Sequence, residues 1–598
     1  SLRACAGEYR DAVELAEYTI NNQKDYILEE LYKRKPDVLC FSCYIWNIDY
    51  VTDIAREYKK LCPSVPIWVG GPEVSYEVEA FLRENPYIDG VMIGEGEDTF
   101  RELCGYYAHK RKLSDIAGIA FRKNSTGNST SVNNIGGNKA GEIVFTSPRP
   151  IKNMSEIPFC YDTLDDFSNR IIYYESSRGC PFSCSYCLSS VDKTLRFRDT
   201  RIVKRELKFF IDQKVPQIKF VDRTFNCNHA HAMELWRFIK ANDNGVTNFH
   251  FEISADLLNQ EELELISDMR PGLIQLEIGV QSTNEVTIKE IHRTMKLERL
   301  KEVVKLIQSG NNIHEHLDLI AGLPYEDYDS FGRSFDEIYE LKPNQLQLGF
   351  LKVLKGSYMF EHAAEYGIVY HDKPPYEVMS TKWLSFDDVI KIKRVEDMLE
   401  VYYNSGQFEI TMKLMECIFD SAFEFFQELG DFYEANGYFG MSHSRIRRCE
   451  ILLEFLALYL HGCDSDAMTS VVLSENAGDR DNTDFDENAI DRDNTDFDEN
   501  AQIYSMIQES LIFDLYYREN CKSRPVWATD IGSFKHMTHA YCKNGKLSHV
   551  EPFHYIFPDK HTRKLDELPK YHKEPVWALF HYDMRDPLDH QALVEYIE

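Results

Sequence analysis

Residues 176–188 read Ser-Ser-Arg-Gly-Cys-Pro-Phe-Ser-Cys-Ser-Tyr-Cys-Leu and place three cysteines, Cys180, Cys184 and Cys187, within eight residues. Spacings of three and two intervening residues can turn the three sulfur atoms toward one centre. The glycine and the proline that flank the first cysteine favour an irregular loop over a helix. The segment therefore predicts a loop that gathers three thiols.

Two kinds of metal site fit clustered thiols. Structural zinc requires a fourth Cys or His at short spacing, and the nearest His, His229, lies 42 residues beyond Cys187. An iron-sulfur cubane with three protein thiolates leaves its fourth iron open for a substrate or cofactor. The spacing therefore favours an iron-sulfur cluster over zinc.

The Cys-x3-Cys-x2-Cys spacing, with Tyr186 before the last cysteine, resembles the signature of the radical S-adenosylmethionine (radical SAM) superfamily. The resemblance implies that the three cysteines hold a [4Fe-4S] cluster whose fourth iron chelates S-adenosylmethionine. It also implies that one electron from the cluster cleaves this cofactor to a 5′-deoxyadenosyl radical. An electron donor such as flavodoxin or ferredoxin would supply that electron.

The family fold is a partial (β/α)6 barrel, which we expect over residues 169–385. Apolar runs of strand length alternate here with amphipathic segments. The expected strands are 170–175, 217–222, 249–254, 273–281, 317–323 and 345–354, and the expected helices include 202–213, 230–241, 261–269, 297–308 and 330–341.

Chemistry in a parallel barrel collects at the carboxyl ends of the strands. Polar residues lie at several of these ends, and the resemblance implies that they bind S-adenosylmethionine. The candidates are Asp222, Arg223, Thr224, Asn226, Glu252, Ser254, Glu277 and Gln281, with Tyr186 beside the cluster. The Gly-Gly-Glu that follows the second strand in the family is replaced here by Asp-Arg-Thr, so the residue that holds the methionyl amino group stays open.

A second alternation of strands and helices precedes the cysteines, in residues 1–110. Strands are expected at 12–20, 37–44, 66–70 and 90–93, which predicts a doubly wound parallel sheet. Two of these strands end in glycines, Gly70 and Gly71 in one and Gly94 and Gly96 in the other. Placed before a radical SAM core, these ends resemble the cobalamin-binding domain of the B12-dependent radical SAM class. The resemblance implies that the tail of cobalamin lies against the first glycine pair and that residues 94–97 close the domain.

Two features of this class are missing from the N-terminal region. The first strand of the cobalamin-binding fold is not found, and the chain opens in what reads as the following helix, residues 1–9. No Asp-x-His-x-x-Gly motif, whose His would ligate cobalt, occurs in the sequence. We therefore expect a sheet without its first strand and no protein His on cobalt.

The remaining segments predict a hairpin and a C-terminal domain. Residues 118–121 and 142–146 predict a hairpin within a linker at 111–168. Residues 386–598 predict long helices, such as 386–403 and 408–429, and a strand-like tail, which together resemble the uncharacterised C-terminal domain that accompanies such cores. An acidic repeat, 479–489 and 491–501, lacks the Gly and the Glu that a calcium loop needs and predicts a disordered insertion at about 475–502.

Composition restricts the partners and the location. A formal net charge of -31 opposes binding to the phosphate backbone of nucleic acid. No apolar run reaches the roughly 20 residues of a membrane-spanning helix, and no export signal is visible. We expect a cytoplasmic protein without a membrane partner and without a disulfide framework.

These features predict a cobalamin-dependent radical SAM enzyme, a methyltransferase that acts on an unactivated carbon of a small-molecule or peptide substrate. Cofactors would carry the chemistry and the protein would place them. A methylthiotransferase would need a second cysteine trio in the N-terminal domain, where only Cys40 and Cys43 lie close together. A non-catalytic sensor of cobalamin or of a cluster is the alternative of another class, and formation of 5′-deoxyadenosine would separate it from any enzyme.

Overall fold

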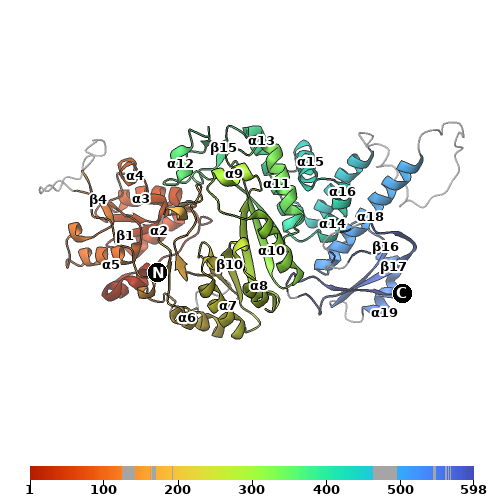
Figure 1. The fold of residues 1–598 in the computed structure, drawn as a ribbon, viewed down its shortest axis with the longest axis horizontal. Coiled ribbons are helices and arrows are strands. Elements are labelled where there is room, and N and C mark those ends of the chain that lie inside the picture. Colours follow the sequence, from red (N-terminus) through yellow and green to blue (C-terminus); the bar gives the residue numbers. More distant parts are fainter. Residues whose placement is uncertain are drawn as a thin grey trace.

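In the computed structural model the chain forms three parts that follow one another along the long axis of the molecule (Figure 1). The N-terminal part contains a small sheet, the central part a partial barrel, and the C-terminal part a helical layer with a second small sheet. The structure describes all residues except 124–141, 162, 165, 166, 168, 169, 192, 462–493, 543–546, 559–561, 563, 564, 566, 587 and 598.

The N-terminal sheet has three parallel strands followed by an antiparallel hairpin. The strands are β1 (Leu39–Ser42), β2 (Ile67–Gly70), β3 (Gly90–Met92), β4 (Ile119–Arg122) and β5 (Ile143–Phe145), in that spatial order. Its helices are α1 (Leu2–Cys5), α2 (Lys24–Arg34), α3 (Ile48–Leu61), α4 (Val78–Glu84) and α5 (Gly96–Tyr107). The predicted hairpin is confirmed, and it extends this sheet instead of standing apart from it.

The strand expected at residues 12–20 is wrong. A 3-10 helix, Gly7–Ala12, leads into a segment without regular structure. Leu15 is 64% exposed and Ile20 48% exposed, so the apolar side chains that suggested a strand do not reach a core. An isolated strand leaves its backbone groups unpaired, and among the described strands β1 pairs only with β2.

The six-stranded barrel is confirmed. Its parallel strands are β6 (Ile172–Tyr174), β9 (Gln217–Phe220), β10 (Asn248–Ile253), β11 (Ile274–Gln281), β12 (His314–Ala321) and β13 (Gln345–Phe350), and they neighbour one another in chain order. The helices are α6 (Thr200–Asp212), α7 (His229–Ala241), α8 (Gln260–Ser267), α9 (Glu285–Glu290), α10 (Leu297–Ser309) and α11 (Tyr328–Tyr339). Such chain-ordered parallel pairing is what successive right-handed β-α-β crossovers produce.

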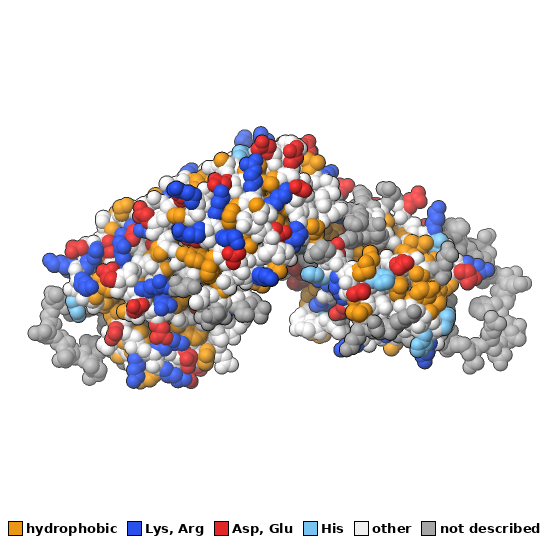
Figure 2. Space-filling model, turned by 90° about the horizontal axis from the view of Figure 1, so that it is seen from below, with side chains coloured by type: hydrophobic (Ala, Val, Ile, Leu, Met, Phe, Trp, Pro, Cys, Tyr) orange, Lys and Arg blue, Asp and Glu red, His pale blue; other side chains and the backbone are white. Residues whose placement is uncertain are grey.

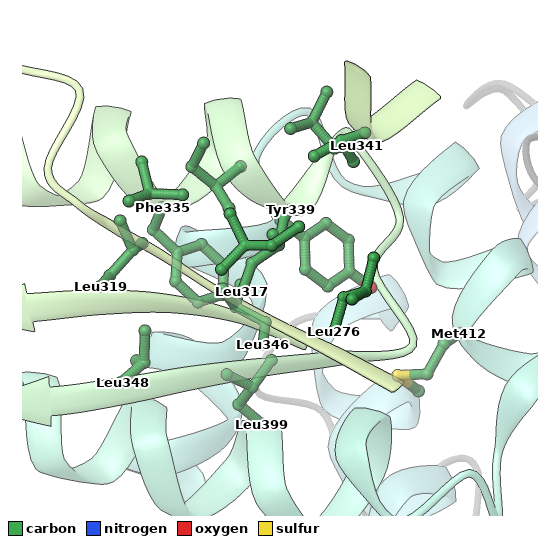
Figure 3. Close-up of a cluster of buried hydrophobic side chains, with 14 of the residues drawn as sticks. Leu276, Leu317, Leu319, Phe335, Tyr339, Leu341, Leu346, Leu348, Leu399 and Met412 are labelled. Carbon is green, nitrogen blue, oxygen red and sulfur yellow. The ribbon is translucent and has the colours of Figure 1, made fainter. Parts of the chain in front are cut away.

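Alternation along the strands separates a hydrophobic face from a polar one. Figure 3 shows leucines of β11, β12 and β13 packed against Phe335 and Tyr339 of α11 and against residues of the following helices. In β11 every second residue is buried, while Gln275, Glu277 and Gln281 between them are only half-buried. Those intervening side chains face the interior of the barrel, where the sequence places its polar residues.

The C-terminal part begins with short elements that close the barrel and continues as a helical layer. They are α12 (Tyr358–His362), β14 (Val369–Tyr370), β15 (Val378–Ser380), α13 (Phe386–Leu399), α14 (Glu409–Ile418), α15 (Ala422–Ala435), α16 (Arg445–His461), α18 (Asn494–Arg518) and α19 (Lys535–Tyr541). An antiparallel sheet of β16 (Ser548–Tyr555), β17 (Tyr571–His581) and β18 (Leu593–Ile597) confirms the strand-like tail.

Two expectations for this part need correction. The helix expected at 408–429 is two helices, because Ser421 caps α15 by accepting from the Glu424 backbone N–H, and its hydroxyl also donates to Asp336 at 2.7 Å. The insertion expected as disordered at about 475–502 overlaps α18, which begins at Asn494. The rest of the acidic repeat lies outside the described residues.

The surface of the described residues is mixed in character. On the face shown in Figure 2, basic and acidic side chains alternate over the central part, whereas hydrophobic and histidine side chains gather on the C-terminal part. Within the part of the chain that the structure describes, no helix is both long enough and apolar enough to cross a bilayer.

Candidate functional site

The cysteine segment is a loop held between two short strands. β7 (Ser177–Arg178) pairs antiparallel with β8 (Arg196–Phe197), and the loop with the three cysteines lies between them. Gly179 has φ +91, and a Cβ there would lie 2.6 Å from the carbonyl oxygen of Thr194. Only glycine fits this position, because both the backbone conformation and the close contact exclude a side chain.

Asp222, at the end of β9, anchors the base of this loop. Its carboxylate accepts from the backbone N–H of Ser176 at 2.7 Å, from the Ser176 hydroxyl at 2.5 Å and from the Ser177 hydroxyl at 2.9 Å. Complete burial raises the pKa of Asp222 to about 6. Asn226 has a comparable role, since its side chain bonds both the N–H and the carbonyl of Ser254. Neither residue lines the cavities described below.

The three thiols share one environment without forming a single-ion site. Cys180 Sγ lies 3.8 Å from the Thr224 hydroxyl, and burial raises the pKa of this thiol. Cys184 Sγ lies 3.8 Å from Nη1 of Arg293. Among the described residues, no three His, Cys, Asp or Glu side chains converge closely enough to bind one metal ion. A cubane fits this arrangement better than zinc does, because each thiolate of a cubane binds a different iron.

A small inner cavity of about 140 Å³ lies beside Cys184 at the carboxyl ends of the barrel strands. Two polar atoms at this cavity lack partners within the described residues. Oε1 of Gln281 accepts no hydrogen bond, and Nε of Arg293 donates none. Burial raises the pKa of Glu252 to about 7. Gln281 has φ +77 at a register shift of β11, so the strand end is irregular where it meets this cavity. Predicted residues that line the inner cavity are Cys184, Arg223, Thr224, Glu252, Ser254, Glu277 and Gln281.

Unpartnered buried polar groups cost free energy unless a ligand satisfies them. The inner cavity offers a carboxyl, an amide oxygen and a guanidinium next to the cysteine loop. These groups suit the ammonium and carboxylate of an amino acid. The residues present therefore fit S-adenosylmethionine bound beside a cluster.

Charged pairs stabilise the floor of the barrel interior. Glu277 Oε2 accepts from Lys219 Nζ at 2.9 Å and lies 2.8 Å from Nε2 of His250. Burial alone would raise the pKa of Glu277, but the hydrogen bond from His250 and the ion pair with Lys219 lower it to about 2. Asp318, whose pKa burial raises, lies 3.1 Å from Nε2 of His316. Adjacent strands thus bring two carboxyl groups, a lysine and two histidines together in the interior.

A larger cavity of about 530 Å³, here called the interdomain cavity, lies between the N-terminal part and the barrel. It shares Arg223, Glu277, Gln281 and Asp318 with the inner cavity, so the two adjoin. Its other walls come from the loops after β1 and β2, from the cysteine loop and from the end of β13. These walls include Tyr44, Ile45, Trp46, Pro72, Glu73, Tyr186, Cys187, Leu188, Gln347, Phe350, Lys352 and Lys355. A more open groove of about 620 Å³ on the outer helices α6 to α8 contains no cysteine and is set apart from this chemistry.

The predicted glycines lie at the carboxyl ends of β2 and β3, and none of them lines this cavity. A Cβ on Gly71, which has φ +122, would lie 2.4 Å from the carbonyl oxygen of Cys43. A Cβ on Gly70 would lie 3.3 Å from Met92. Gly94 has φ +75 and open space where its Cβ would be, whereas Gly96 packs on Leu2 at the start of α5. Open space at a glycine strand end fits a ligand such as cobalamin approaching this edge of the sheet.

The acids of the Gly-Glu-Gly-Glu segment join the N-terminal part to the cysteine loop. Glu95 lies 2.6 Å from Arg196 and 3.1 Å from Arg178, and Glu97 lies 2.9 Å from Arg178. Arg178 immediately precedes Gly179, so these ion pairs hold the loop and the N-terminal sheet in one arrangement. The Gly-Glu-Gly-Glu motif is visible in the sequence, but the two arginines that pair with its acids could not be identified there.

Several functional candidates escaped the sequence prediction. Three of them, Lys219, His250 and Asp318, are polar residues at alternating positions of otherwise apolar strands. That alternation is the sequence signal that could have identified them as interior residues. Arg293 lies in the loop after α9 and carries no recognisable pattern, since only the fold places it against Cys184. Trp46 stacks on Tyr44 with ring centroids 4.6 Å apart, in a loop that composition alone does not distinguish.

Three family descriptions match consecutive parts of the chain. A B12 binding domain matches residues 1–104, the radical SAM superfamily matches residues 174–338, and a protein of unknown function (DUF4080) matches residues 364–591. The chain thus combines the two domains on which the interdomain cavity depends with a third of unassigned role.

Curated relatives include two methyltransferases. The cobalamin-dependent radical SAM methyltransferase TokK of Streptomyces tokunonensis is 29% identical over 331 residues, which cover 51% of this chain and 45% of TokK. The 2-(S-pantetheinyl)-carbapenam-3-carboxylate methyltransferase of Streptantibioticus cattleyicolor is 26% identical over 322 residues, covering 51% of this chain and 45% of that enzyme. The matched region spans less than half the length of either relative.

Solved structures show the same fold. The cobalamin-dependent S-adenosylmethionine radical enzyme OxsB superposes with a TM-score of 0.52 at 16% identity, over 86% of this chain and 78% of OxsB. The radical S-adenosylmethionine methyltransferase TsrM of Kitasatospora setae superposes with a TM-score of 0.50 at 16% identity, over 63% of this chain and 78% of TsrM. The chain therefore carries a B12 binding domain followed by a radical SAM domain, in the fold of these solved structures.

Proposed function

We propose that the protein is a cobalamin-dependent radical SAM enzyme that methylates an unactivated carbon of a small-molecule or peptide substrate, with electrons from a donor such as flavodoxin or ferredoxin. One observation carries the proposal. The cysteine loop and the loops that follow β1 and β2 of the N-terminal sheet meet at one pair of adjoining cavities. Cofactors on the two domains would therefore face a common substrate space.

The chain's own residues would hold the cluster and its cofactor. Cys180, Cys184 and Cys187 supply three thiolates, and the Asp222 anchor fixes the loop that carries them. Arg293 offsets the negative charge of the Cys184 thiolate. In the inner cavity the Glu252 carboxylate would accept from the ammonium of S-adenosylmethionine.

When bound, these cofactors supply a 5′-deoxyadenosyl radical and a methyl group. The protein's part is placement and protection. Ile320 of β12 lines the barrel side of the interdomain cavity, and the stacked rings of Tyr44 and Trp46 line its N-terminal side. Such walls exclude water, which limits side reactions of a reactive species.

An anaerobic assay tests the proposal in two stages. Reconstituted protein with a reductant should convert S-adenosylmethionine to 5′-deoxyadenosine and should retain about one corrinoid per chain. With extracts of small molecules as substrate, a methyl group from isotopically labelled S-adenosylmethionine should appear on carbon in a product. The Cys187→Ser variant, matched in size, should form neither 5′-deoxyadenosine nor a methylated product. Corrinoid retention without 5′-deoxyadenosine would instead support a sensor, and the enzyme proposal would be rejected.

A further inference from the structure

We propose that the substrate carries a carboxylate or phosphate group that binds among Arg223, Lys352 and Lys355 in the interdomain cavity. The inference rests on the proposed function, because it treats this cavity as the substrate space. It adds a chemical class that neither the domains nor their fold specify. The argument depends on which charges in the cavity already have partners.

Each acid of the cavity wall has a hydrogen-bond or ion-pair partner among the described residues. Glu73 accepts a hydrogen bond from the Tyr376 hydroxyl, and burial raises the pKa of its carboxyl. Glu277 has Lys219 and His250 as partners at 2.9 and 2.8 Å. The remaining acid, Asp318, has His316 at 3.1 Å. Among the described residues, none of these acids forms an ion pair with the three cations that line the same cavity.

The cations that line the same cavity have no such partners. Within the described residues, no carboxylate lies within 4.0 Å of Arg223, Lys352 or Lys355. Lys355 instead lies over the Tyr376 ring, 5.3 Å from its centroid. Arg223 and Lys352 are exposed to the cavity and to solvent. The cavity therefore presents three cations that form no ion pair within the described residues, although Arg223 still interacts at longer range with Glu252 and Lys355 with Glu73.

These charges stand out against the rest of the chain. Acidic residues outnumber basic ones by 98 to 67, and the net charge is -31. Such a field repels anions in general, so an anionic ligand needs local cations to bind. A cavity lined by three cations that form no ion pair with the described acids is suited to an anion. Charge-assisted hydrogen bonds to carboxylate or phosphate are stronger than hydrogen bonds between neutral groups.

The positions of the three cations also orient the ligand. Arg223 lines both cavities and marks the boundary between them, whereas the two lysines follow β13 on the interdomain side. An anionic group held there would leave the rest of the substrate against Ile320 and the stacked rings of Tyr44 and Trp46. The carbon to be methylated would then lie near the inner cavity.

Paired ligands that differ only in charge test the inference. Calorimetry would compare glutarate with its neutral diamide, glutaramide, and pyrophosphate with both, on protein loaded with cluster, S-adenosylmethionine and hydroxocobalamin. We expect glutarate or pyrophosphate to bind and glutaramide not to bind. Whichever anion binds more tightly identifies the group as carboxylate or phosphate.

Substitutions test whether the two lysines of the cavity bind the anion. Lys352→Gln combined with Lys355→Gln should weaken binding of the preferred anion by about tenfold or more, the loss expected for one or two charge-assisted bonds. Lys305→Gln, an exposed lysine on α10, should bind as the unaltered protein does. Equal binding of glutarate and glutaramide, or unchanged affinity in the double variant, would overturn the inference. A parallel loss of corrinoid or S-adenosylmethionine from the double variant would also overturn it, because the lysines would then serve a cofactor.

This test is separable from that of the proposed function. Failure to bind an anion, while 5′-deoxyadenosine still forms and corrinoid is retained, removes only the substrate class. Failure to form 5′-deoxyadenosine, while anion binding still depends on the two lysines, removes the proposed function and leaves an anion site.

Discussion

Removing the charge of Arg293 should lower the midpoint potential of the cluster. Nη1 of Arg293 lies 3.8 Å from Cys184 Sγ and 3.2 Å from the Tyr186 hydroxyl, and Nη2 donates to the carbonyl of Gly279. A cluster gains one negative charge on reduction, so a fixed positive charge beside a ligand sulfur favours the reduced form. Arg293→Gln keeps a hydrogen-bond donor and removes that charge.

The size of the shift follows from the geometry. Adding a metal-sulfur bond of about 2.3 Å to the 3.8 Å contact places the guanidinium about 6 Å from the iron. A unit charge at about 6 Å, with an effective dielectric constant of about 20, contributes about 3 kcal/mol. For a one-electron couple this corresponds to about 120 mV.

A redox titration followed by electron paramagnetic resonance measures the shift directly. Arg293→Gln should titrate about 120 mV lower than the unaltered protein by the same Coulomb estimate, with an unchanged iron content. Arg293→Lys should shift less, because the charge is kept. Arg237→Gln, on the outer face of α7, serves as the control and should not shift. A potential within about 20 mV of the original in the Gln variant, well below the Coulomb estimate, would refute the reasoning.

Four further predictions use other measurements. Cys184→Ala should lose the visible absorbance of the reconstituted cluster, and a variant that keeps about four irons per chain would remove the ligand assignment. Arg178→Met leaves Glu97 without its ion pair, so urea unfolding should show a loss of about 3 kcal/mol, and an unchanged midpoint would argue against a domain link. The raised pKa of Glu252 predicts that affinity for S-adenosylmethionine increases as the pH rises through about 7, because the ionised carboxylate attracts the ammonium. Glu252→Gln should flatten that dependence, and a persisting slope would assign it to another group. Gly71→Leu should reduce corrinoid retention while 5′-deoxyadenosine still forms, and full retention would show that this turn does not approach cobalamin.

The barrel is the part of the fold that local sequence determines most fully. Strands such as β11 alternate buried apolar and half-buried polar residues, and this period of two is visible without a structure. The helices between the strands begin at residues that cap them, as Asn259 does for α8 with a complete capping box. Local pattern and tertiary structure agree here, so the positions of the barrel strands and helices could be predicted.

The N-terminal error shows where local pattern fails. Leu15 and Ile20 give residues 12–20 a strand-like composition, yet a strand exists only when a neighbour accepts its hydrogen bonds. The division of the helix expected at 408–429 has a similar origin. A serine can cap a helix in many sequence contexts, so Ser421 alone does not predict a helix start. In the structure α15 begins after Ser421, whose hydroxyl also contacts Asp336 of α11.

The sequence by itself determined the cysteine spacing, the two α/β domains and the polar ends of the barrel strands, because each is written in neighbouring residues or in a short period. Only the tertiary structure decided that Asp222 and Asn226 support the loops while Glu252 and Gln281 line a cavity. It also decided that Glu95 and Glu97 join the domains, and that Arg293 contacts the Cys184 thiol. These roles depend on which side chains meet across distant segments, and burial and Coulomb interactions between such segments have no local signature in the chain.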